Sequence, residues 1–208
     1  GVGSSGAVCA AVYDAYKTKA FSKTNQNYKE DFAIMESHFH GSSSGIDPLI
    51  SFINKAILVG NYGDISEVTL PLYNTGKGGL FLLNTGRTRR TEPLVNLFLE
   101  KCKSLDFLNR IENDLLKIND KCITALLEGN IENLYRDFEA LSSFQFEEFT
   151  PMIPNLYRDL WRDGLVSKKY FLKLCGAGGG GFLLGMTKDF DQSEELLNQY
   201  EIRPLIRF

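Results

Sequence analysis

The sequence predicts an α+β fold, in which helices and antiparallel strands occupy separate parts of the chain. Helical patterns come in runs, and the longest run, from residue 92 to residue 162, lies between two apolar segments that suit strands. Strands and helices do not alternate as a repeating unit, which disfavours a parallel sheet. The 208 residues allow one or two domains, and 43% hydrophobic with 24% charged residues is typical of a globular protein.

The composition excludes several classes of protein. A net charge of −3 lacks the excess of Lys and Arg with which nucleic-acid-binding proteins neutralise phosphates. No apolar run approaches the ~20 residues that span a bilayer. The four cysteines form no Cys-x-x-Cys pair and are too sparse for a disulfide scaffold, which indicates reduced thiols. We therefore expect a cytoplasmic protein that binds neither nucleic acid nor a membrane.

The first fifty residues predict three helices joined by turns. A glycine-rich turn over residues 1–6 precedes a helix of small residues from Ala7, and a second helix is expected over 28–39. Ser- and Gly-rich turn chemistry at 40–48 then leads into a short helix from Pro48. Because a loop that opens a helix usually follows a strand, we expect the chain to be the carboxy-terminal portion of a longer protein.

Three strands are expected next. Residues 56–59 and 65–70 are joined by Gly- and Asn-containing turn chemistry at 60–64, which predicts a hairpin. Residues 79–84 form a continuous apolar run that suits a buried strand.

The rest of the chain is mostly helical and ends with strands. From Glu92 the apolar residues follow helical spacing, and Pro93 falls in the first turn, where proline is tolerated. Later helices are expected over 105–127, 131–141, 155–162 and 193–200, and strands over 170–175, 182–186 and 203–206. The strands at 170–175 and 182–186 flank a second glycine cluster, Gly176 to Gly181, and are expected to pair.

The first glycine cluster, Gly1-Val2-Gly3-Ser4-Ser5-Gly6, predicts a phosphate-binding loop. Its spacing matches the dinucleotide-binding fingerprint, but residues 22–28 are polar and do not form the required strand ending in an acidic residue. Neither cluster ends in Gly-Lys-Ser/Thr, so a Walker A loop is absent. Backbone N–H groups at a helix N-terminus, with two serine hydroxyls beside them, favour an anion. A tight turn with serine caps is the alternative.

Three ordered motifs resemble those of the GHMP small-molecule kinases. The first cluster followed by Ala7 is similar to Gly-Leu-Gly-Ser-Ser-Ala-Ala. The segment Glu36-x-x-x-His40-Gly41-Ser42-Ser43-Ser44-Gly45-Ile46-Asp47 resembles the mevalonate kinase pattern of Glu, His-Gly and then Pro-Ser-Gly-x-Asp. Lys173-Leu174-Cys175 with the second glycine cluster resembles Lys-Leu-Thr-Gly-Ala-Gly-Gly-Gly-Gly.

This chain departs from the family patterns in several places. Gly6 replaces Ala, Ser43 replaces Pro, Pro48 replaces Asn and Cys175 replaces Thr, which puts the substrate in doubt more than the chemistry. The family's first motif, which carries a basic residue near the acceptor hydroxyl, is not in this sequence.

The resemblance implies a two-domain GHMP-kinase fold. Residues 1–76 would be the remainder of an amino-terminal domain of ribosomal-protein-S5-like topology, and residues 77–208 a ferredoxin-like carboxy-terminal domain. It also implies ATP as co-substrate and Mg²⁺ as cofactor.

The resemblance further assigns roles to individual residues. It implies that Ser5 and Glu36 ligate Mg²⁺, and that Asp47 accepts the proton of the acceptor hydroxyl or orients it. Arg89 and Thr91 would lie near the acceptor. The residues that would contact ATP are Gly1, Val2, Gly3, Ser4, Ser5, Gly6, Gly178 and Gly179. Each assignment has an ordinary structural alternative: a helix cap for Ser5 and Asp47, and a solvated charge for Glu36 and Arg89. His38 and His40 stand two apart without a third ligand nearby, so His40 is expected to be structural.

The function expected from the resemblance is phosphorylation of a small-molecule alcohol by ATP, with mevalonate, an isoprenoid precursor, as the favoured acceptor. Alternatives are another GHMP kinase with a sugar or phosphomevalonate acceptor, or an inactive fragment that needs the missing amino-terminal segment or a partner chain. A homodimer remains open.

Overall fold

The computed structural model describes residues 3–17, 24–40, 43–71, 75–87 and 91–208. The chain divides into two compact units, residues 1–70 and residues 71–208. No helix in the described part of the chain combines the length and the apolar character that crossing a membrane requires.

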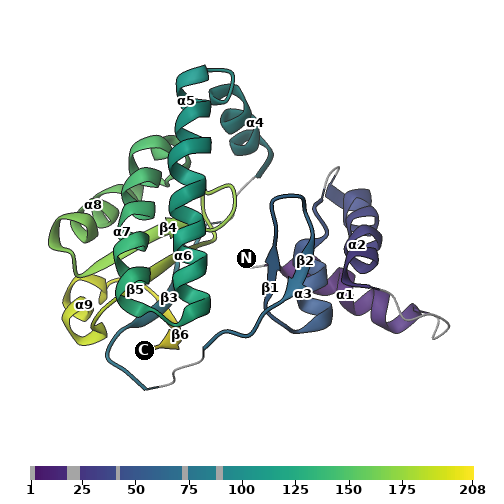
Figure 1. The fold of residues 1–208 in the computed structure, drawn as a ribbon, viewed down its shortest axis with the longest axis horizontal. Helices are drawn as coiled ribbons and strands as arrows, with labels where there is room; N and C mark the ends of the chain where they lie inside the picture. The colour runs from purple at the N-terminus through teal and green to yellow at the C-terminus, as the bar shows by residue number, and fades with distance from the viewer. Residues whose placement is uncertain (1–2, 18–23, 41–42, 72–74, 88–90) are drawn as a thin grey trace. The chain divides into compact units, whose positions relative to one another are not determined.

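The first unit contains three helices and a hairpin (Figure 1). The helices are α1 (Ser4–Tyr16), α2 (Asn25–His40) and α3 (Ile46–Ile53), and the antiparallel strands are β1 (Ile57–Val59) and β2 (Ile65–Glu67). Three buried residues, one from each helix, form its core: Cys9, Phe32 and Leu49. Aromatic rings of Tyr13 and Phe52 meet Phe32 edge to face, with centroids 4.9 and 5.5 Å away.

The first helix begins earlier than the sequence predicted. Its N-cap is Gly3, with φ of 64°, and Ser4 already belongs to the helix. No side chain of the described residues caps this end, so the serine-cap alternative is wrong.

The second unit is built on a four-stranded antiparallel sheet. The strands are β3 (Gly79–Asn84), β4 (Tyr170–Leu174), β5 (Phe182–Thr187) and β6 (Ile202–Arg207), in the spatial order β4-β5-β3-β6. The chain passes from β3 through a set of helices to the β4–β5 hairpin, and then through α9 (Phe190–Leu197) to β6. This order and connectivity are those of a ferredoxin-like domain, as the sequence predicted.

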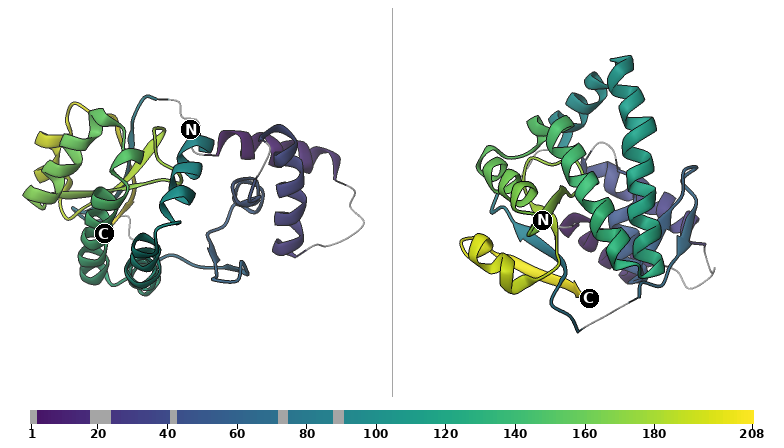
Figure 2. Two further views of the ribbon diagram at one scale, coloured as in Figure 1. Left: turned by 90° about the horizontal axis from the view of Figure 1, so that it is seen from above. Right: turned by 60° about the vertical axis from the view of Figure 1, so that its left-hand side comes forward.

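Five α-helices lie between β3 and β4 in the described part of the chain (Figures 1 and 2). They are α4 (Thr91–Lys101), α5 (Leu105–Arg110), α6 (Leu116–Glu128), α7 (Ile131–Glu148) and α8 (Arg158–Ser167), with short 3₁₀ turns at Thr150–Met152 and Asn155–Tyr157. Among them, α7 and α8 pack against the sheet. The single helix expected over 105–127 is interrupted by a π-helical turn at Ile111–Leu115. Helices α6 and α7 lie side by side.

Strand β3 packs against a core cluster on each of its faces, which explains the continuous apolar run at residues 79–84. Phe81 and Leu83 pack into one core cluster with Trp161, whereas Leu80 packs into another with Phe138 of α7. Alternate residues of a strand point to opposite faces, so helices on both sides demand apolar residues at every position.

The outer edge of β4 is closed by side chains of α7. The Leu172 N–H donates to Ser142 Oγ over 3.3 Å, and the Leu174 N–H donates to Gln145 Oε1 over 2.8 Å. Ser142, which is fully buried, also accepts from Trp161 Nε1 at 2.9 Å. Side chains thus replace the partner strand that an edge would otherwise recruit.

Ser142→Ala is expected to lower the free energy of unfolding by about 1–3 kcal/mol for each of the two donors left unpaired. Chemical denaturation measures the loss. The neighbouring Ser143→Ala, which changes a half-buried residue on the same helix, serves as the control. An equal loss in both variants would contradict the role of Ser142.

Candidate functional site

The N-terminus of α1 is arranged as an anion site. Ser4 and Ser5 form the exposed first turn, and Gly6 is buried behind them. The first N–H groups of a helix lack intrahelical partners and carry the positive end of the helix dipole. These N–H groups, at the predicted phosphate loop, are therefore placed where a phosphate would find donors.

Glu36 of α2 lies against this helix end. Its carboxylate is buried, with the residue 8% exposed, and Oε1 accepts a hydrogen bond from Ser5 Oγ at 3.0 Å. Its other oxygen, Oε2, accepts a hydrogen bond from Ser43 Oγ. The alternative of a solvated helical glutamate is therefore wrong.

The charge of Glu36 affects the pKa of the Cys9 thiol. This thiol stands one turn after Ser5 on α1, and burial together with the negative charge of Glu36 raises its pKa. The Glu36 carboxylate therefore acts on α1 at Cys9 as well as at Ser5.

The donor set suits a magnesium ion. One carboxylate and the hydroxyls of Ser5 and Ser43 are hard oxygen ligands of the kind that Mg²⁺ prefers. The described residues contain no group of three or more His, Cys, Asp and Glu side chains that could hold a metal by themselves. Mg²⁺ commonly completes its shell with water and nucleotide phosphates, so the few protein ligands fit it.

Asp47 lies in the first turn of α3, beside the N-terminus of α1. The N-cap of α3 is Gly45, whose φ is 73°, so Asp47 does not cap the helix. A Cβ built on Gly3 would lie 3.6 Å from Asp47 Oδ2, which places the carboxylate next to the N-cap of α1. Asp47 is exposed, as a group that meets a substrate must be.

The second glycine cluster packs tightly within its own unit. The Gly179 N–H donates to the Met152 carbonyl at 2.7 Å, and the Gly181 N–H donates to the Arg87 carbonyl at 2.9 Å. A Cβ on Gly178, whose φ is 80°, would lie 2.6 Å from the Met152 oxygen. The glycines therefore permit a close approach to neighbouring backbone, and contact with the phosphate loop stays a prediction.

Several predicted site residues lie outside what the structure describes. Gly1, Val2 and Arg89 are not among the described residues, and of Thr91 only the backbone, at the start of α4, is described. Their assignments stay predictions. Ser43, which contacts Glu36, was noted in the sequence only as a departure from the family pattern; the three serines that follow Glu36 were the available signal.

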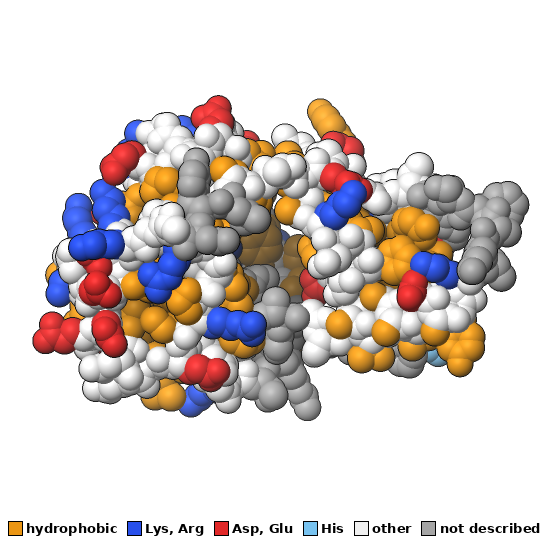
Figure 3. Space-filling model, turned by 90° about the horizontal axis from the view of Figure 1, so that it is seen from below, with side chains coloured by type: hydrophobic (Ala, Val, Ile, Leu, Met, Phe, Trp, Pro, Cys, Tyr) orange, Lys and Arg blue, Asp and Glu red, His pale blue; other side chains and the backbone are white. Residues whose placement is uncertain are grey.

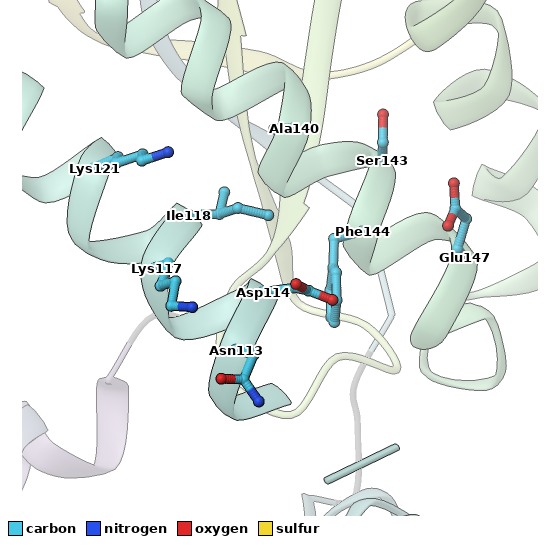
Figure 4. Close-up of a pocket in the computed structure, with 9 residues that line it drawn as sticks. All are labelled: Asn113, Asp114, Lys117, Ile118, Lys121, Ala140, Ser143, Phe144 and Glu147. Carbon is cyan, nitrogen blue, oxygen red and sulfur yellow. The ribbon is translucent and has the colours of Figure 1, made fainter. Parts of the chain in front are cut away.

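A groove in the second unit lies apart from the predicted site residues. On the face in Figure 3, Lys and Arg side chains are interspersed with Asp and Glu side chains. An open groove of about 410 Å³ lies between α6 and α7, lined in part by Lys117, Lys121 and Glu147 (Figure 4). None of the predicted site residues lines it, and its charges of both signs indicate no particular ligand.

Comparison with known proteins shows the fold. No protein-family model and no curated protein matches the sequence. The structure of L. major mevalonate kinase in complex with R-mevalonate is similar, with 18% identity, a TM-score of 0.67, and coverage of 94% of this chain and 60% of that kinase. Streptococcus pneumoniae phosphomevalonate kinase in complex with phosphomevalonate and AMPPNP gives 18% identity, a TM-score of 0.69, and coverage of 97% and 68%. The chain has the fold of these kinases and spans 60% and 68% of their lengths.

Proposed function

We propose that the protein containing this chain is a GHMP-family kinase that transfers the γ-phosphoryl group of ATP to a small-molecule alcohol, with mevalonate as the first-choice acceptor. One observation carries the proposal: Ser5 and Glu36, 31 residues apart, meet at the N-terminus of α1, where Asp47 also lies. Phosphate donors, hard metal ligands and an exposed acid are the parts that phosphoryl transfer needs.

Each residue has a part in this reaction. The N–H groups at the start of α1 would hold the nucleotide phosphates, and Ser5 with Glu36 would hold Mg²⁺, which would supply positive charge against the charge of the phosphates. Asp47 takes the proton of the acceptor hydroxyl as its oxygen forms a bond to the γ-phosphorus and the bond from that phosphorus to ADP breaks.

The second unit carries the other proposed assignments. Gly178 and Gly179 are proposed to contact the nucleotide and Arg89 and Thr91 the acceptor, because a guanidinium suits a carboxylate or a phosphoryl group. A cytoplasmic location and a homodimer are also part of this proposal.

Phosphomevalonate is the alternative acceptor. The chain is similar to a mevalonate kinase structure and to a phosphomevalonate kinase structure at the same 18% identity, which shows the shared fold and favours neither acceptor. The two acceptors share a skeleton and differ in the anionic group that the site must hold.

The full-length protein is expected to release ADP with mevalonate and much less with galactose or homoserine. A coupled ADP-release assay compares these alcohols and phosphomevalonate in the presence of Mg²⁺-ATP. Best turnover with phosphomevalonate would reassign the acceptor, and best turnover with a sugar would leave only the kinase class. Absence of ADP release with every acceptor would contradict the proposed activity.

A further inference from the structure

The contact between Gly6 and the start of α3 is closer than any side chain would allow. A Cβ on Gly6 would lie 2.7 Å from Pro48 N, 2.8 Å from the Asp47 carbonyl carbon and 2.9 Å from Asp47 Cβ. Carbon atoms in contact prefer about 3.5–4.0 Å. The neighbours are mostly backbone atoms, so no rotation of a side chain relieves such a clash.

The start of α3 also lies against the backbone of α2. A Cβ on Gly45, the N-cap of α3, would lie 2.1 Å from the Lys29 carbonyl oxygen and 2.8 Å from Ala33 N, both in α2. Leu49, one turn further along α3, is fully buried in the core. The first turn of α3 therefore lies against the backbones of both α1 and α2. A larger residue on α1 at this contact would displace Asp47.

Glycine at position 6 is unfavourable for helix α1 on its own. Inside a helix, glycine is about 0.5–1 kcal/mol less favourable than alanine. The resemblance to the GHMP kinases predicts Ala at position 6 and Asn at position 48, and this chain differs at both. The two differing residues are in contact with one another.

We propose that Gly6 is a positioning residue, which lets the N-terminus of α3 approach α1 closely enough to place the Asp47 carboxylate beside the phosphate-binding end of α1. The inference rests on the proposed function, because it concerns the acid of that reaction. It adds a residue that acts through Asp47.

A double-mutant cycle in the full-length protein tests this positioning. Gly6→Ala is expected to lower kcat by about 10²-fold, the cost of misplacing a catalytic group by about 1 Å, with little change in the KM for Mg²⁺-ATP because alanine keeps the backbone N–H that would face the phosphates. The double variant with Asp47→Asn should be no slower than Asp47→Asn alone, because the acid through which Gly6 acts is already gone. Losses that multiply, or an unchanged kcat in Gly6→Ala, would overturn the inference.

The melting temperatures of two variants separate a steric clash at position 6 from the effect of helix propensity. Ala11→Gly, at an exposed position of α1, measures the intrinsic cost of glycine and should lower the melting temperature. Gly6→Ala should also lower it, although propensity alone would raise it. A rise in melting temperature would show that position 6 has room for a methyl group, and the inference would fail.

A second variant keeps the test decisive if Gly6→Ala does not fold. Pro48→Ala keeps the backbone nitrogen that faces Gly6 but removes the ring bonded to it, without adding an atom to α1, and any loss of kcat should likewise vanish in the Asp47→Asn background. An independent loss would overturn the inference. If Asp47→Asn itself keeps full activity, the proposed role of Asp47 fails instead, so the two failures are distinguishable.

Discussion

Asp47→Asn in the full-length protein is expected to lower kcat by on the order of 10²–10⁴, the range for loss of a positioned proton acceptor. The substitution keeps the size of the side chain and removes its charge. Because Asp47 lies beside α1 and does not cap α3, the fold should not depend on its charge. Steady-state kinetics with saturating acceptor measures the effect.

Nucleotide binding provides the internal control for this variant. If Asp47 meets the acceptor hydroxyl and leaves the phosphates to α1, the dissociation constant of Mg²⁺-ATP should change little. Asp64→Asn removes the same charge from an exposed turn of the same unit and should leave kcat unchanged. Full activity in Asp47→Asn would withdraw the catalytic assignment.

Glu36→Gln is expected to weaken the apparent affinity for Mg²⁺-ATP, by about 10–100-fold, a typical scale for disturbing a metal site. The amide keeps an oxygen that accepts a hydrogen bond from Ser5 or Ser43, so the local structure is preserved while the charge is lost. Titration of activity with Mg²⁺ at fixed ATP measures the shift. An unchanged magnesium dependence would mean that Glu36 only anchors the two serines.

The Cys9 thiol gives a readout of Glu36→Gln that does not depend on activity. The charge of Glu36 is one of two causes that raise the pKa of Cys9, and burial is the larger. Removing that charge should lower the pKa of the thiol part of the way toward its ordinary value. The pH dependence of Cys9 alkylation measures the change, in a background in which serine replaces Cys102, Cys122 and Cys175 so that Cys9 is the thiol that reacts.

Local patterns in the sequence located most elements. The strand predicted over 79–84 is β3, the hairpin at 56–70 contains β1 and β2, and the strands around the second glycine cluster pair as β4 and β5. These predictions hold because apolar periodicity and turn residues act over a few neighbours. The sequence did not predict the π-helical turn at Ile111–Leu115, because one extra residue in a helical turn leaves the apolar pattern nearly unchanged.

By itself, the sequence determined the α+β class and the order of the elements, and two motifs that resemble those of a known family predicted Ser5, Glu36 and Asp47 as site residues. The tertiary structure alone decided that Ser43 and Ser5 both donate hydrogen bonds to Glu36, that Gly3 rather than a serine is the N-cap of α1, and that Gly6 lies against the backbone of α3. The physical reason is distance along the chain. A motif fixes residue types within a few positions, whereas contacts between separate helices depend on backbone paths set by the packing of the whole unit.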